Sequence, residues 1–117
     1  MFRQILEKMV NDVPGALSAV LMGNDGIAVE QFPAQSTDGQ SLIVELGNTV
    51  KEIHHTTTVL AVGELQEITV QCEKVTFLLL MLNEEYFVAM LLDSPAAAGK
   101  GRYVMKRDAG RLRSALD

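Results

Sequence analysis

The stretch most suggestive of chemistry spans residues 94–101, with the sequence SPAAAGKG, between a predicted strand and a predicted helix. A phosphate-binding loop in that place needs two spaced glycines to cradle the phosphates and a Ser or Thr to hold magnesium. Ser94 stands at the position of the first glycine, and Gly101 stands where the hydroxyl is required. We therefore predict that this segment binds no nucleotide and connects the strand to the last helix.

The other side chains that could bind a metal or attack a substrate are isolated. His54 and His55 are adjacent, so on a helix they point about 100° apart, whereas one metal ion needs ligands at i and i+4. Cys72 has no histidine near it in sequence to act as a base, and its place in an alternating strand predicts a buried structural thiol. Glu84 and Glu85 lie in a predicted turn, where water solvates them. We predict no catalytic residue, no metal ligand and no cofactor.

The composition describes an acidic body with a basic end. The 117 residues predict one domain spanning 1–117, and a hydrophobic fraction of 48% predicts a globular chain. Residues 1–99 carry 4 basic and 13 acidic side chains, a balance of −9, whereas residues 100–117 carry 6 and 2, a balance of +4. The basic segment has two interpretations: a docking surface, or a solvated helix face whose cations suit the C-terminal end of the helix dipole.

The same counts exclude several classes of protein. A net charge of −5 argues against a general binder of nucleic acid or of anionic membranes. The single cysteine rules out an intrachain disulfide framework. The N-terminal segment lacks the apolar run of a signal peptide, and an apolar stretch such as 77–82 is too short to span a bilayer. We therefore expect a cytoplasmic protein.

The apolar pattern divides the chain into helices and strands in the order α-β-β-α-β-β-β-α. Apolar residues recur at steps of three and four in the helices, whereas the strands are apolar runs bounded by turns such as 23–26 (GNDG). Hairpin connections predict a largely antiparallel sheet, and two wholly apolar strands predict helices on both of its faces. The predicted helices are 2–13, 38–61 and 101–116, and the predicted strands are 17–22, 27–32, 65–72, 75–82 and 86–92.

The middle helix and the third strand both have surfaces that a second copy of the chain could bury. Apolar residues of 38–61 form a nearly heptad seam, widened by Leu42, Val44 and Val59. A run of three threonines weakens the last turn, so we expect this helix to end early. The strand 65–72 alternates in polarity as an edge strand does, and its residues do not block pairing strongly. We predict a dimer joined through Leu46, Val50 and Ile53 of the helix and Leu65, Glu67, Ile68, Thr69, Val70 and Gln71 of the strand.

Three segments carry a resemblance to a known family. They are VPGA at 13–16, AVLMGNDGIAV at 19–29 and GELQEITV at 63–70, followed by two apolar strands and a basic helix. In this combination and order the chain resembles bacterial roadblock (dynein light-chain roadblock) proteins over essentially its whole length. The resemblance implies an α/β (α+β) fold of the roadblock/profilin-like kind, a five-stranded antiparallel sheet flanked by three helices.

The resemblance also implies a function. Family members form homodimers, or heterodimers with a related roadblock protein, through the third strand and the middle helix. They regulate or scaffold small Ras-like GTPases, and some stimulate GTP hydrolysis without donating an arginine. The positions of this chain that match the GTPase-binding helical surface are Glu45, Asn48, Lys51, Glu52 and His55.

We therefore expect a non-enzymatic dimeric module that binds a GTPase. Two alternatives of other classes stay open at this stage. One is a small-molecule or signal-sensing domain of a bacterial regulatory circuit, which would need an apolar pocket with a few convergent polar groups. The other is a purely structural scaffold subunit.

Overall fold

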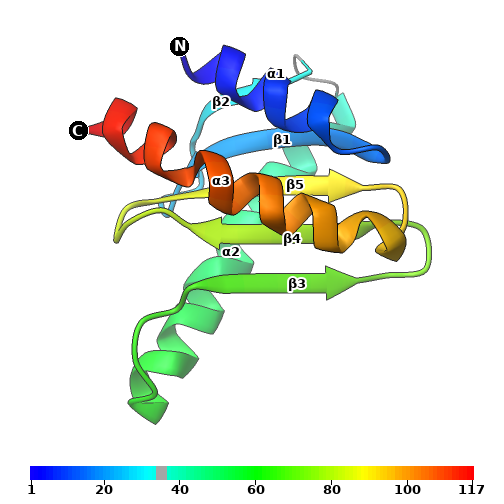
Figure 1. Cartoon of the computed structure of the whole chain (residues 1–117). Helices are drawn as coiled ribbons and strands as arrows, with labels where there is room; N and C mark the ends of the chain where they lie inside the picture. Colours follow the sequence, from blue (N-terminus) through cyan, green and yellow to red (C-terminus); the bar gives the residue numbers. More distant parts are fainter. Residues whose placement is uncertain (34–36) are drawn as a thin grey trace.

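The computed structural model describes residues 1–33 and 37–117, and the side chains from residue 44 onward in the second of these ranges. It contains one five-stranded antiparallel sheet with the strand order β2-β1-β5-β4-β3 (Figure 1). The elements follow the predicted order, which confirms the α/β fold. They are α1 (Phe2–Asp12), β1 (Ala16–Gly23), β2 (Ala28–Phe32), α2 (Thr37–Leu60), β3 (Glu67–Gln71), β4 (Thr76–Met81), β5 (Tyr86–Leu92), a 3-10 turn (Pro95–Ala97) and α3 (Ala98–Leu116).

The three helices cover both faces of the sheet, as the apolar central strands require. Helices α1 and α3 lie side by side on one face, and α2 lies on the other (Figure 1). Alternation along each strand sends successive side chains to opposite faces. The sheet therefore carries two separate apolar clusters, a larger one under α1 and α3 and a smaller one under α2.

Helix α3 packs closely on β4 because Gly101 allows it. A Cβ at Gly101 would lie 2.7 Å from Cδ1 of Leu78. The helix begins at Ala98, three residues earlier than predicted, because the 3-10 turn leads directly into it. The loop expected before the helix is therefore short.

An ionic network joins α1 to α3. Arg107 donates to Asp108 (2.9 Å) and to Asp12 (2.7 Å), and Lys8 donates to Asp12 (2.9 Å). The Lys8 ammonium, followed by the Arg107 guanidinium, lowers the pKa of Asp12 below its usual 3.8. Asp108 is buried, so Arg107 and the more distant Arg111 (3.9 Å) compensate its charge.

The two edges of the sheet differ in regularity. In β2, Glu30 pairs with Leu21 and Ala28 pairs with Met22, so Val29 is an extra, unpaired residue. Such a bulge distorts an edge and hinders the addition of another strand. In β3, all five residues pair with β4 in unbroken register. The β3 edge is therefore the one suited to pairing.

Helix α2 continues through the run of three threonines that was expected to weaken its last turn. The helix runs through the three threonines to Leu60, so the predicted range 38–61 is confirmed to within one residue at each end and only the expectation of an earlier end is wrong. The hydroxyls of Thr56, Thr57 and Thr58 donate to backbone carbonyls one turn back, at Glu52 and His54. These bonds satisfy the side chains without breaking the helix.

No helix in the described part of the chain combines the length and the apolar character needed to cross a membrane.

Candidate functional site

The outer edge of β3 presents backbone hydrogen-bonding groups away from the sheet. The Gln66 carbonyl accepts a bond from the Met81 N–H (2.9 Å), and the Cys72 N–H donates to the Val75 carbonyl (2.9 Å). Because inward and outward groups alternate along an antiparallel strand, the N–H and C=O groups of the odd-numbered residues point outward. The outward groups belong to Glu67, Thr69 and Gln71, and no strand within residues 1–33 and 37–117 pairs with them.

The side chains of β3 divide between the two faces of the sheet. Ile68 and Val70 are half-buried, and Ile68 packs against the cluster under α2. Glu67 and Thr69 are exposed on the opposite face, where Lys106 and Arg102 of α3 reach them at 2.9 and 3.4 Å. The strand predicted over 65–72 is two residues shorter at its start, and Leu65 lies half-buried in the segment that leads into it.

Helix α2 uses its first described turns to cover the sheet. Leu46 and Val50 are 7% and 2% exposed and pack on the sheet of their own chain. Their predicted place in a dimer interface is therefore corrected: the seam that suggested a partner faces β1, β4 and β5 here. Ile53, one turn further on, is only half-buried. The cover that α2 gives to its own sheet fades at this residue.

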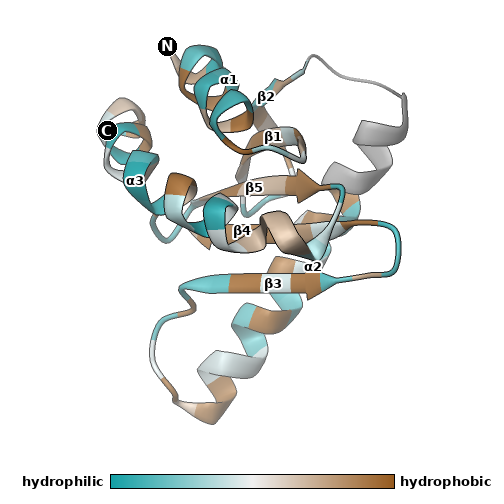
Figure 2. Ribbon diagram, turned by 45° about the vertical axis from the view of Figure 1, so that its right-hand side comes forward, coloured by the Kyte–Doolittle hydropathy of each residue, from teal (hydrophilic) through white to brown (hydrophobic). Residues whose placement is uncertain are grey.

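The last two turns of α2 project past the β3 edge (Figures 1 and 2). The helix has 24 residues and is about 36 Å long, whereas five strands span only about 20 Å. Val59, Leu60 and the following Val62 are 69%, 63% and 68% exposed. We call these three residues the apolar overhang. The sequence analysis did not identify Leu60 and Val62 as exposed residues. The predicted length of the helix was a usable signal, because a helix of that length is longer than five strands are wide.

The five positions matched to a GTPase-binding surface all lie exposed on α2. The steps from Glu45 to Asn48, Glu52 and His55 are three, four and three residues, so these side chains form one stripe along the helix. Lys51 lies beside it, three residues from Asn48. The stripe faces away from the sheet and carries two carboxylates, with the Lys51 ammonium at its side.

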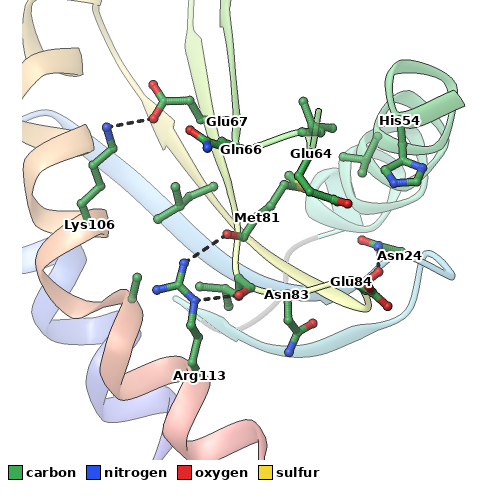
Figure 3. A pocket seen from close by; sticks show the side chains of 15 residues that line it. Asn24, His54, Glu64, Gln66, Glu67, Met81, Asn83, Glu84, Lys106 and Arg113 are labelled. Atoms are coloured by element: carbon green, nitrogen blue, oxygen red, sulfur yellow. Dashed lines mark hydrogen bonds and ion pairs between the residues drawn. The ribbon is translucent and has the colours of Figure 1, made fainter. Parts of the chain in front are cut away.

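A cleft of about 620 Å³ opens where the segment before β3 joins the end of the sheet (Figure 3). On one wall, Arg113 donates to the Leu82 carbonyl (2.6 Å) and more weakly to that of Met81 (3.4 Å). His54 of α2 and Glu64 lie on the opposite side (Figure 3). Groups of both charges line the cleft, so it differs from the apolar pocket that a sensor domain would need.

Cys72 lies on the surface, so the prediction of a buried thiol is wrong. The strand ends at Gln71, one residue earlier than expected, and the Cys72 N–H closes the turn to Val75. The alternation that placed Cys72 inward therefore stops before it. His54 and His55 are both exposed, as expected of surface histidines.

Comparison with known proteins shows which solved structures have the same fold. No family model and no curated protein matches the chain. Among solved structures, MglC from Myxococcus xanthus is 34% identical, with 97% of this chain and 98% of that chain covered and a TM-score of 0.70. The Roadblock/LC7 domain from Streptomyces avermitilis is 17% identical, covering 97% and 95%, at 0.88. The gliding protein MglB from Thermus thermophilus is 18% identical, covering 95% and 84%, at 0.80. The last two matches show the fold alone.

Proposed function

The chain belongs to the roadblock family, and on that premise we propose that it is a dimeric, non-enzymatic module that regulates or scaffolds a small Ras-like GTPase. One observation carries the proposal. The unpaired β3 edge and the apolar overhang of α2 lie on the same side of the molecule, so one partner can cover both. A second copy of the chain is the simplest partner, because it offers the same two features in return.

Symmetry restricts how two β3 strands can pair. A two-fold axis perpendicular to the sheet keeps each face on its own side, so directly opposed residues must point to the same face. The axis therefore passes midway between the two copies of one residue. In the register centred on Thr69, the whole of Glu67–Gln71 overlaps and three outward-facing pairs exchange about six hydrogen bonds.

Side-chain charges support the same register. In the register centred on Thr69, Glu67 lies opposite the neutral Gln71 of the second copy, so no two like charges, which would destabilise a sheet, face each other within the paired strands. A register centred on Ile68 or on Val70 would leave part of Glu67–Gln71 without a partner strand. The register centred on Thr69 is therefore favoured.

Pairing in this way also covers the apolar overhang. Beyond its own β3, the end of α2 lies over the β3 and β4 strands of the second copy. On that face the half-buried Ile68 and Phe77 of each copy need further apolar cover. Burying Leu60 and Val62 against them would contribute about 25 cal/mol for each Å² of apolar surface removed from water.

The GTPase-facing part of the proposal uses the exposed stripe of α2. Glu45, Asn48, Glu52 and His55 remain on the solvent side of the helix after pairing, so they are available to a second protein. The sequence of residues 37–60 contains no arginine. Any stimulation of hydrolysis from this surface would thus act by positioning the GTPase, since no arginine finger is available there.

The test is co-purification of the full chain from its native host, followed by reconstitution with the GTPase recovered. We expect binding that depends on the nucleotide, stronger with a non-hydrolysable GTP analogue than with GDP. The Glu52→Lys variant should weaken it about tenfold or more, while the matched control Glu7→Lys on α1 should not. Recovery of only a metabolite or a histidine kinase would instead favour the sensor alternative. Recovery of only a related roadblock protein would favour a heterodimeric scaffold.

A further inference from the structure

The flank of α3 that faces β3 carries three cations in one line. Arg102, Lys106 and Arg113 are separated by four and seven residues, so they lie within about 40° of one another around the helix. We call them the cationic stripe. Its members reach Thr69, Glu67 and the Leu82 carbonyl respectively. Figure 3 shows Lys106 and Arg113 on this flank.

Most of the charge in the stripe is not neutralised by its neighbours. Lys106 pairs with Glu67, although its side chain stays 59% exposed. Arg102 donates to a hydroxyl and Arg113 to backbone carbonyls, which hold the side chains in place and leave their charge uncancelled. The stripe is therefore strongly positive on a chain whose net charge is −5.

Gly110, a glycine beside the cationic stripe, independently indicates that another molecule can approach the backbone of α3 closely. A Cβ at Gly110 would meet no described atom within 4 Å, whereas one at Gly101 would collide with Leu78. A glycine inside a helix costs about 1 kcal/mol relative to alanine, and the packing of this chain does not require Gly110. Lys106 precedes it by one turn and Arg113 follows it by one turn. Bare backbone therefore lies between two cations.

An exposed aromatic side chain completes this surface. Tyr103 is 60% exposed, two turns before Gly110 on the same outer side of α3, and Lys100 lies over its ring (5.5 Å to the centroid). Aromatic side chains with one polar end are enriched where proteins meet. The outer flank of α3 thus combines cations, an aromatic group and accessible backbone.

From these features we propose that the outer flank of α3 docks an acidic segment of a partner protein, with Glu or Asp side chains on the cationic stripe and the partner's backbone close to Gly110. This surface lies on the opposite face of the sheet from α2 (Figure 1). A protein bound there leaves the stripe of α2 free. The chain would then connect two partners at once.

Dimer formation would double the docking surface. The doubling rests on the proposed dimer. The docking surface itself does not, because the cationic stripe is formed by one chain. Because α3 covers β4, paired β3 strands would separate the two α3 helices by three strand spacings, about 14 Å. Packed helices lie only 8–10 Å apart. The two stripes would therefore line a channel, open to solvent, that runs over the joined strands.

Charge distribution favours a peptide over nucleic acid or a membrane. The stripe is narrow, Glu67 lies against it, and Glu84 lines the far side of the adjoining cleft. A duplex or a membrane surface is wide enough to meet these carboxylates, which would repel its phosphates. A single acidic segment is narrow enough to follow the cations alone.

The test measures binding of a fluorescein-labelled poly-L-glutamate peptide to the full chain by anisotropy at low salt. We expect saturable binding, which the double variant Arg102→Gln with Lys106→Gln weakens by at least about tenfold. The control variant Arg3→Gln with Lys8→Gln removes the same two charge types on α1 and should stay within about twofold. Absence of binding, or equal loss in the control, would overturn the proposal.

A second variant separates docking from simple charge. Gly110→Leu adds bulk at the proposed contact without changing charge, and leucine favours the helix. We expect an unchanged or higher melting temperature together with at least about tenfold weaker binding. Unchanged binding would overturn the contact at Gly110. Tighter binding of single-stranded DNA, or of vesicles containing phosphatidylserine, would overturn the choice of a peptide.

Sedimentation of the same samples distinguishes the two proposals. Loss of peptide binding in a variant that still dimerises supports the α3 surface independently of β3. A wild-type chain that binds the peptide as a monomer would contradict the dimer and leave the α3 surface intact. A dimer that does not bind the peptide would overturn the α3 proposal alone.

Discussion

Gly47 of α2 packs directly on Gly26 of the β1–β2 turn: a Cβ at Gly47 would lie 2.9 Å from the Gly26 Cα. Gly26 has a φ of +89°, which only glycine adopts readily, so its backbone cannot easily move away. We predict that Gly47→Ala destabilises the fold by about 1–3 kcal/mol, as overpacking does. Urea unfolding followed by circular dichroism measures this.

Gly110→Ala is the matched control for that substitution. It introduces the same methyl group into a helix where the Cβ meets no described atom within 4 Å. We expect it to stabilise the fold by about 0.5–1 kcal/mol, because alanine loses less conformational freedom than glycine. If both variants were equally destabilised, the Gly47–Gly26 contact would not be the cause.

Proline substitutions in β3 should separate pairing from folding. The Thr69 N–H points to the open edge, whereas the Val70 N–H bonds within the sheet. We predict that Thr69→Pro abolishes the dimer and leaves a folded monomer, because the backbone loses only an outward donor and the hydroxyl that is also lost makes just one long contact, to Arg102 (3.4 Å). Val70→Pro should destabilise the fold itself. Sedimentation velocity and thermal melting report the two effects, and an unaltered dimer for Thr69→Pro would count against the β3 joint.

Two leucines of α2 should behave differently when truncated. Leu46 is 7% exposed, so Leu46→Ala should cost about 2–5 kcal/mol of folding free energy. Leu60 is 63% exposed, so Leu60→Ala should leave the monomer stable and weaken only the dimer. Dilution series in the ultracentrifuge measure the second effect. A dimer dissociation constant unchanged by Leu60→Ala would show that the overhang contacts no partner.

The ionic network of α1 and α3 predicts a response to acid. Since the folded-state pKa of Asp12 lies below 3.8, its ion pairs stabilise the fold above that value and are lost as pH falls through the folded pKa. Wild type should therefore exceed Asp12→Asn in melting temperature by a constant margin above about pH 5. The margin should close below pH 3.8. Glu7→Gln, an exposed carboxylate change on the same helix, is the control, and a margin that persists in acid would contradict the assignment.

Local patterns predicted the elements well. The strand predicted at 86–92 coincides with β5, and the element order and the two-sided cover follow from the apolar runs of β4 and β5. The patterns did not show how much of α2 lies over the sheet. A heptad seam shows which side of α2 is apolar, but only the width of the assembled sheet decides where cover ends, after Val50. Leu42, which was predicted to widen the seam, lies outside the described side chains.

The candidate site was also predictable only in part, because its limits depend on neighbouring elements as well as on the local sequence pattern. Alternation in 65–72 identified an edge strand, yet its end at Gln71 depends on the turn to β4, and this placed Cys72 outside. The stripe of α2 was located through the family resemblance, and the structure adds only that its side chains are exposed. Which backbone groups face outward required the hydrogen bonds of Gln66 and Cys72, and a sequence does not contain those.

The most direct test of the shared sheet is disulfide trapping across β3 in a Cys72→Ser background. In the register centred on Thr69, the Thr69 Cα atoms of the two copies lie about 5.5 Å apart, within the range that a disulfide spans. We predict that Thr69→Cys forms a dimer of twice 12.8 kDa on a non-reducing gel. Glu67→Cys should cross-link only when mixed with Gln71→Cys. A monomeric Thr69→Cys band, or equal cross-linking by Val29→Cys on the opposite edge, would contradict the account.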